Sequence, residues 1–381
     1  MLIRHPPGAK LEGTMPAEQY SKNWWIELCE SRLASAPAYE EAIGGKWLRG
    51  QFGELGVATH QVQCHPLLRI VCAGDGATLR TANAAFSELA SAQHFDQRVD
   101  GLRDLRDEHQ FWAKWNEIRS AYSVVRSGLS VSFPTERGNN LGKSPEFVFS
   151  WGGQNVAVEV ATISETKERV GARNRFLDEL LSAVKAAKKS GRGGAFGGVV
   201  PQPERFGGGW STVSKLRSIK SGSKQSVAYG VKLLNVIVSS NLLLPLDFLP
   251  DGYLDNEGLR YRYSGRIYNA HYGIKGQSLY WHHSIGRSNS FSRTSSVQKD
   301  SGRFVDNTSV SAAIWTMHPH CDDGSAALSS QEEIIYCPLA GAGASAPEGL
   351  VKQLDQGFRF NRNLSVVPGL SEEFPGPHRI R

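Results

Sequence analysis

The sequence predicts a mixed α+β or α/β fold in which a sheet is flanked by helices. The first observation is a pair of segments within residues 144–161 in which apolar and polar residues alternate on either side of a glycine turn. The second is a helical apolar stripe over residues 102–126, and the third is a run of branched apolar residues from Val231 to Ser239. A helix, a hairpin and an apolar strand in this order indicate a core built around a sheet.

The length of 381 residues suffices for one large domain with elaborations or for two domains. We expect the core at residues 101–245, preceded at residues 1–100 by an N-terminal helical region of unknown role. Residues 246–381 are rich in basic and aromatic side chains, and we expect this C-terminal elaboration to pack on the core.

The N-terminal region is expected to consist mainly of helices. Residues 16–43 and 81–92 have helical patterns, and Pro37 is expected to end or interrupt the first helix. Residues 67–72 are apolar and partly branched, so we predict a strand there. The candidate buried stripe of the first helix is formed by Trp24, Trp25, Leu28 and Leu33.

The core is expected to begin with the helix at residues 102–126. Its apolar stripe contains Phe111, Trp115, Ile118, Tyr122 and Val125. A strand at residues 129–133 leads into the hairpin. The elements expected after the hairpin are helices at 174–189 and 212–225, a central strand at 231–239, a buried strand or helix start at 309–317, a strand at 332–336 and a peripheral tail from Leu350.

Two glutamates stand on the predicted hairpin. Alternation places Glu146 on the polar face of the first strand, and a turn of two or four residues would set Trp151 opposite Val156. Glu146 then lies opposite Ala161, with Glu159 one diagonal step away on the same face, about 7–8 Å distant at Cα. Two carboxylates at this spacing can share one hard cation. The alternative is that each pairs with an arginine or lysine in an ordinary sheet.

The net charge of +6 is distributed unevenly. Residues 180–246 contain ten Lys or Arg against the single acid Glu204, and residues 258–299 contain seven and no acid. Aromatic residues interleave with the second segment, which suits phosphate contacts and base stacking; the alternative is a solvated basic face with no partner. The candidate nucleic-acid-binding residues are Arg192, Lys215, Lys220, Arg260, Arg262, Arg266 and Arg287.

Histidine and cysteine do not predict a zinc site. The group His60, Cys64 and His65 matches no zinc-ligand spacing, so buried or surface histidines are the better interpretation. The residues from His318 to Asp323 lack a second close ligand pair, and a surface turn is the default there.

The apolar segments, the N-terminus and the cysteines together predict a cytoplasmic protein. There is no apolar run of the roughly 20 residues needed to span a membrane, and the N-terminus has no signal-peptide pattern. The five cysteines are odd in number and scattered, which argues against a disulfide framework and suits a reducing compartment.

The order of predicted elements resembles the core of the PD-(D/E)XK nuclease superfamily over residues 103–240. Pro145-Glu146 matches the first acidic position of the motif, with glutamate in place of aspartate, and Glu159 matches the second. Glu117 stands where the family often has a further glutamate on the preceding helix. Lys220 and Lys224 resemble basic positions on the helix that follows the hairpin.

The resemblance implies a restriction-endonuclease-like fold and a Mg²⁺-dependent endonuclease that hydrolyses DNA, of restriction or phage-defence type. It implies the catalytic residues Glu117, Glu146, Glu159 and Lys224, with Glu146 and Glu159 as the Mg²⁺ ligands. Double-strand cleavage commonly needs two active sites, so a homodimer is compatible with this activity.

One departure from the motif leaves alternatives open. The family has lysine where this chain has Ala161, so another cation such as Lys143, Lys167 or Lys224 must substitute, or the site is inactive. A nucleic-acid-binding protein without catalysis is therefore the second hypothesis. A third is a different enzyme whose site lies among the C-terminal histidines, namely His271, His282, His283, His318 and His320.

Overall fold

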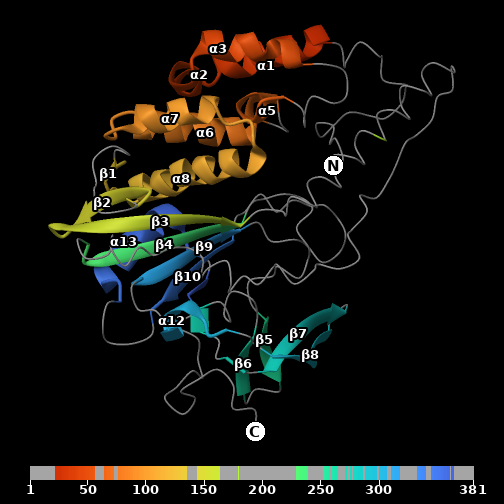
Figure 1. Ribbon diagram of the computed structural model, residues 1–381, viewed down its shortest axis with the longest axis vertical. Helices are drawn as coiled ribbons and strands as arrows, with labels where there is room; N and C mark the ends of the chain where they lie inside the picture. Colours follow the sequence, from red (N-terminus) through yellow and green to blue (C-terminus); the bar gives the residue numbers. More distant parts are fainter. Residues whose placement is uncertain are drawn as a thin grey trace. The chain divides into compact units, whose positions relative to one another are not determined.

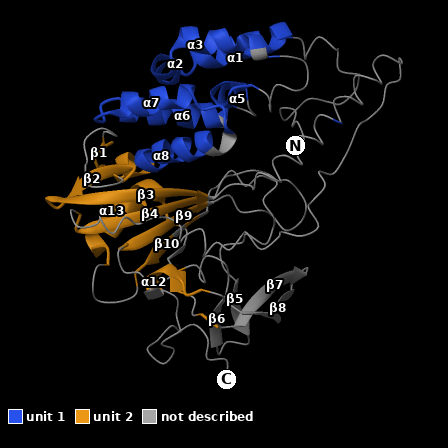
Figure 2. Ribbon diagram, in the orientation of Figure 1, with its two compact units in different colours: residues 1–122, 165–205 blue, residues 123–164, 206–381 orange. Residues whose placement is uncertain are grey.

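The structure of the chain is a computed structural model. It describes residues 22–55, 64–72, 76–134, 144–163, 179, 229–238, 252–256, 260–264, 271–272, 275–276, 278–285, 288–297, 300–306, 310–317, 333–339, 345–360 and 362–363. The chain divides into two compact units, shown in Figure 2. Unit 1 comprises residues 1–122 and 165–205, and unit 2 comprises residues 123–164 and 206–381.

The described part of unit 1 is helical. Its elements are α1 (Lys22–Ala34), α2 (Pro37–Ile43), α3 (Gly45–Gly50), the 3₁₀ helix η2 (Gln51–Glu54), α5 (Pro66–Cys72), α6 (Ala77–Leu89), α7 (Phe95–Arg103) and most of α8 (Glu108–Arg126), whose last four residues belong to unit 2. Pro37 opens α2, where a fixed φ and a missing N–H cost nothing. The break at Pro37 and the helices predicted at 81–92 and within 22–43 are confirmed, and the helix predicted from 102 begins at Glu108. Residues 16–21 and, apart from residue 179, the helices predicted at 174–189 and 212–225 lie outside the described residues.

Two details of the N-terminal prediction are wrong. Residues 67–72 belong to the helix α5 and not to a strand; this short apolar run is buried on nearly every side, so it shows no periodicity that separates the two. The buried stripe of α1 is Trp25, Cys29 and Leu33, at spacings of four residues, while Trp24 is exposed.

His65 is an ordinary core histidine, as predicted. It is 1% exposed, and its Nδ1 accepts a hydrogen bond from the backbone N–H of Leu67 at 3.2 Å. Its ring meets Trp47 and Phe111 edge to face, with centroids 4.9 and 6.2 Å away. The packing of this side chain needs no metal.

Unit 2 contains a seven-stranded mixed sheet of order β1-β2-β3-β4-β9-β10-β11 (Figure 1). The strands are β1 (Val131–Ser132), β2 (Phe147–Trp151), β3 (Gln154–Ile163), β4 (Val231–Val238), β9 (Ala312–Met317), β10 (Glu333–Pro338) and β11 (Arg362–Asn363). β1, β2 and β3 form an antiparallel meander, and β4 runs parallel to both β3 and β9. The mixed α+β class is confirmed, and the predicted strand at 231–239 occupies the centre of the sheet.

The sheet extends beyond the predicted core, because β9, β10 and β11 come from residues 246–381. The same region forms two separate hairpins, β5 (Gly252–Asn256) with β6 (Arg260–Ser264), and β7 (Ser278–Ile285) with β8 (Ser288–Val297). The division into two units thus differs from the three regions expected from the sequence.

The peripheral tail expected from Leu350 is instead the helix α13 (Glu348–Phe358) followed by β11. Leu350, Leu354 and Phe358 are buried at spacings of four residues. The tail prediction was wrong because this amphipathic stripe is short and stands in a polar, glycine-containing context.

Candidate functional site

Glu146 and Glu159 lie near one another where β2 and β3 meet: Glu146 directly precedes β2, and Glu159 is on β3. Gly152 and Gly153, with φ of 56° and 79°, form the two-residue turn of the hairpin, so Trp151 pairs with Gln154 and Phe147 with Val158. Glu146 precedes the last of these pairs and Glu159 follows it. Because side chains alternate along a strand, Glu159 points away from the face that carries Val158. Glu146 lies at a bend just before β2.

The predicted register was wrong by two residues, since Trp151 does not pair with Val156. The observed turn has two residues, but its centre lies between Gly152 and Gly153, one residue earlier than predicted, so each residue of β2 pairs two positions earlier on β3. A shift of two keeps every paired side chain on its face. The ladder ends at the pair Phe147–Val158, one residue short of each glutamate.

The carboxylate of Glu146 is held by the neighbouring strand. Its Oε2 accepts a hydrogen bond from the backbone N–H of Val160 at 3.3 Å, and its own backbone N–H donates to the carbonyl of Val158 at 3.1 Å. Both glutamates are half-buried. The acidic pair thus occupies a defined place where β2 and β3 meet.

Register extends this face across the sheet. The pairs Ala157–Lys232, Glu159–Leu234 and Ala161–Val236 connect β3 to β4, and Val236 pairs in turn with Trp315 on β9. Ala161 stands at the position of the motif lysine and is buried, with 6% of its surface exposed. An alanine at this position supplies no cation. Lys232 does lie on the glutamate face, one strand away, and its partial burial lowers the pKa of its ammonium group.

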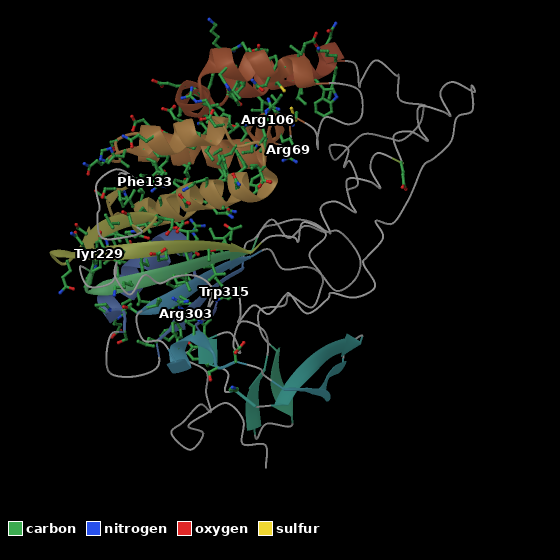
Figure 3. All side chains as sticks on the ribbon, viewed as in Figure 1. Arg69, Arg106, Phe133, Tyr229, Arg303 and Trp315 are labelled. Carbon is green, nitrogen blue, oxygen red and sulfur yellow. The ribbon has the colours of Figure 1, made fainter. Side chains whose placement is uncertain are left out.

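A second cation comes from the short helix α12 (Arg303–Asp306). Arg303 is 3% exposed and is labelled with Trp315 in Figure 3. Burial lowers the pKa of Arg303, and the negative charge of Glu159 opposes that effect. Arg303 therefore lies within electrostatic reach of Glu159.

His271 ties α12 to the sheet. It is fully buried; its Nε2 accepts a hydrogen bond from Trp315 Nε1 at 2.6 Å, and its ring stacks on Phe304 with centroids 4.7 Å apart. Burial, and then the nearby charge of Arg303, lower the pKa of His271 to about 3. The imidazole is thus neutral at physiological pH, with the proton on Nδ1.

The buried imidazole predicts acid sensitivity. The pKa of His271 is about 3 in the fold against 6.5 in the unfolded chain. The contribution of the neutral imidazole to the free energy of unfolding is therefore complete above pH 6.5 and is lost as the pH falls toward 3. We expect the free energy of unfolding, measured by urea titration, to drop by about 2 kcal/mol between about pH 7 and about pH 5. His271→Gln keeps an acceptor for the indole N–H and should remove most of this dependence; an unchanged pH profile in that variant would contradict the assignment.

Glu117 belongs to unit 1 and has partners there. It is 6% exposed, and its carboxylate forms ion pairs with Arg98 and with Lys114, each at 3.1 Å. Two cations account for the burial of this carboxylate without a metal ion. Its predicted catalytic role stays a prediction.

Most of the predicted cationic residues lie outside the described residues, namely Lys143, Lys167, Arg192, Lys215, Lys220, Lys224, Arg266 and Arg287. Arg260 and Arg262 are on β6, of which the backbone is described. Of the C-terminal histidines, His282 and His283 are on β7, and His318 and His320 also lie outside the described residues.

Sequence reasoning did not place Lys232 or Arg303 near the glutamates, and it named His271 only as one of several C-terminal histidines. Lys232 opens an apolar strand and could have been placed by strand register, had the partner of β3 been known. Arg303 is 144 residues from Glu159 and no spacing signals the contact.

Among the described residues, no group of three or more His, Cys, Asp or Glu side chains is arranged to hold a metal ion. The described helices include none with the length and apolarity required to cross a membrane. Comparisons of the chain with protein-family models, with curated proteins and with solved structures found no match.

Proposed function

We propose that the chain is a Mg²⁺-dependent endonuclease that hydrolyses DNA phosphodiester bonds at a site formed by Glu146 and Glu159. The observation that carries the proposal is the hydrogen bond that the Glu146 carboxylate accepts from the backbone N–H of Val160, the neighbour of Glu159 on β3. The element order adds support: α8, an antiparallel meander and then a strand parallel to β3 agree with the order expected for a restriction-endonuclease-like core.

The donor set suits Mg²⁺. This ion keeps several of its waters and takes one or two carboxylates, with the substrate phosphate completing the shell. Glu146 and Glu159 would supply the carboxylates, and bound Mg²⁺ would polarise the scissile phosphate and lower the pKa of a coordinated water. With two protein ligands, affinity for the ion would depend on the bound substrate.

Lys232 and Arg303 are the cations that would act in place of the absent motif lysine. Lys232 is half-buried on the same face and would stabilise the negative charge that develops on the phosphoryl oxygens. Arg303 is too deeply buried to reach a nucleic acid, so it would act as a positioning residue whose charge attracts the Glu159 carboxylate. The basic runs at residues 180–246 and 258–299 would supply phosphate contacts.

A nucleic-acid-binding protein without catalysis is the second candidate. The specific observation in its favour is Ala161 on the glutamate face, together with a cation beside Glu159 that can neutralise this carboxylate without a metal. Its binding would depend steeply on salt concentration, as phosphate contacts do, but not on Mg²⁺.

A cleavage assay separates the two. We expect the full chain to cut duplex DNA in the presence of Mg²⁺, to stop when a chelator is added and to resume when Mg²⁺ is restored. Substrates should include supercoiled, linear and single-stranded DNA and RNA. Salt-dependent binding with no cleavage of any substrate would reject the endonuclease and favour the binding protein.

A further inference from the structure

A pair of thiols lies between two helices of unit 1. Cys29 is in α1 and Cys72 is the last residue of α5; their Sγ atoms are 3.2 Å apart although the residues are 43 positions apart in sequence. Both cysteines are reduced and buried, with exposed fractions of 0% and 4%. The cysteines are scattered along the sequence, as predicted, but the fold brings Cys29 and Cys72 together.

The surroundings make the two sulfurs unequal. The hydrogen bond between the two sulfurs and then the charge of Arg32 lower the pKa of Cys29 against the effect of burial. Arg32 is anchored there, because its Nη1 donates to the carbonyl of Val71 at 2.8 Å. The same hydrogen bond and burial raise the pKa of Cys72. Cys29 is therefore the better nucleophile and Cys72 keeps its proton.

We propose that Cys29 and Cys72 form an oxidisable dithiol, a modification site at which a small hydroperoxide such as hydrogen peroxide produces a reversible disulfide between α1 and α5. A disulfide requires sulfurs about 2.05 Å apart, so the pair needs to close by only about 1 Å. This inference is independent of the proposed nuclease activity, because it concerns side chains of unit 1 alone.

The reaction balances in two steps. The Cys29 thiolate attacks one oxygen of hydrogen peroxide, the O–O bond breaks, and Cys29 becomes a sulfenic acid as hydroxide leaves. The sulfur of Cys72 then attacks the Cys29 sulfur, the S–O bond breaks, and the S–S bond forms with loss of a second hydroxide. The two hydroxides take up the two thiol protons as water, so the thiols lose two electrons and the peroxide gains them.

Burial determines the class of oxidant. A protein disulfide or a glutathione-sized reagent cannot approach sulfurs that are 0% and 4% exposed, whereas hydrogen peroxide is about as small as water and neutral. Cys64 is the competing partner, because its charge also raises the pKa of Cys72. Ring closure between residues 43 positions apart would restrict the unfolded chain and clamp α1 to α5.

The experiment treats the full chain with hydrogen peroxide, alkylates the remaining thiols and maps peptides before and after reduction. We expect a peptide joining Cys29 to Cys72, loss of two hydrogen atoms in the intact mass, and reversal by a reductant. The thermal midpoint of the oxidised chain should rise by roughly 5 °C or more. Cys337→Ala, which removes a buried cysteine of unit 2, is the matched control and should still form the link.

Several results would overturn the inference. A Cys64–Cys72 link, or oxidation that stops at sulfinic acid, would show that the near approach of the two sulfurs does not direct the chemistry. A Cys29–Cys72 link without a rise in the thermal midpoint would remove the clamping role. Mapping of the unaltered chain decides the linkage even if Cys29→Ala or Cys72→Ala fails to fold.

Discussion

Replacing Glu159 with glutamine is expected to reduce Mg²⁺-dependent DNA cleavage at least ~10²-fold, since even ligand-supporting residues contribute 10–100-fold at metal sites. The amide preserves the shape of the side chain but removes the charge that attracts the ion. Single-turnover cleavage at saturating DNA measures the loss, and a filter-binding assay should show that DNA binding persists. Glu348→Gln is the matched control, because it makes the same change at an exposed carboxylate of the same unit.

Because Arg303 lies near Glu159, the Glu159→Gln substitution is expected to affect stability as well as cleavage, and a double variant separates the two effects. Glu159→Gln leaves the buried guanidinium without its acidic neighbour, so the variant is also expected to lose stability. The double variant Glu159→Gln, Arg303→Met removes both charges and should recover stability but not cleavage. Recovery of both would make the glutamate a structural ion-pair partner and contradict its role as a Mg²⁺ ligand.

Gly357→Ala is expected to destabilise unit 2 by about 3 kcal/mol. A Cβ at this position would stand 2.0 Å from the carbonyl oxygen of Ser123 and 2.7 Å from the backbone nitrogen of Ser127, both on the last turns of α8 and the segment after it. Backbone atoms cannot move aside as a flexible side chain can. The helix α13 would therefore have to separate from its neighbour.

The contacts of α13 show what such a separation would cost. Ser127 Oγ donates to the carbonyl of Leu354 at 3.2 Å, and Gln353 Nε2 donates to the carbonyl of Ser127 at 3.1 Å. Trp151 Nε1 also donates to Gln353 Oε1 at 3.0 Å, which joins α13 to the hairpin.

Denaturant titration of the full chain measures this loss. Gly101→Ala is the control, since a Cβ added at this position of α7 would meet no atom of the described residues within 4 Å, and alanine should gain up to about 1 kcal/mol of helix propensity there. A neutral or stabilising Gly357→Ala would show that α13 is not packed as closely as described.

Local patterns predicted much of the sheet of unit 2. Alternation in residues 144–161 predicted two strands, and the glycines predicted their turn. The register was wrong by two residues, which leaves every paired side chain on its predicted face, because an even shift cannot change the face. The branched run at β4 likewise predicted a central strand, since such a run is suited to burial on both sides.

Short apolar segments were harder to predict. α5 was expected to be a strand because six or seven buried residues carry no usable period, and only packing on all sides selects the helix. α13 was missed because its three buried residues mean little until Ser123 and Trp151 are known to face them.

By itself, the sequence determined the mixed fold class, the hairpin, the nearness of Glu146 and Glu159 and the basic character of two long segments. Tertiary structure alone decided that Lys232 and Arg303 join that face, that His271 is held neutral behind them, and that Cys29 meets Cys72. The physical reason is range. Periodicity and turn chemistry act over a few residues and can be read locally, whereas these contacts join residues 32 to 144 positions apart and arise only when the elements pack.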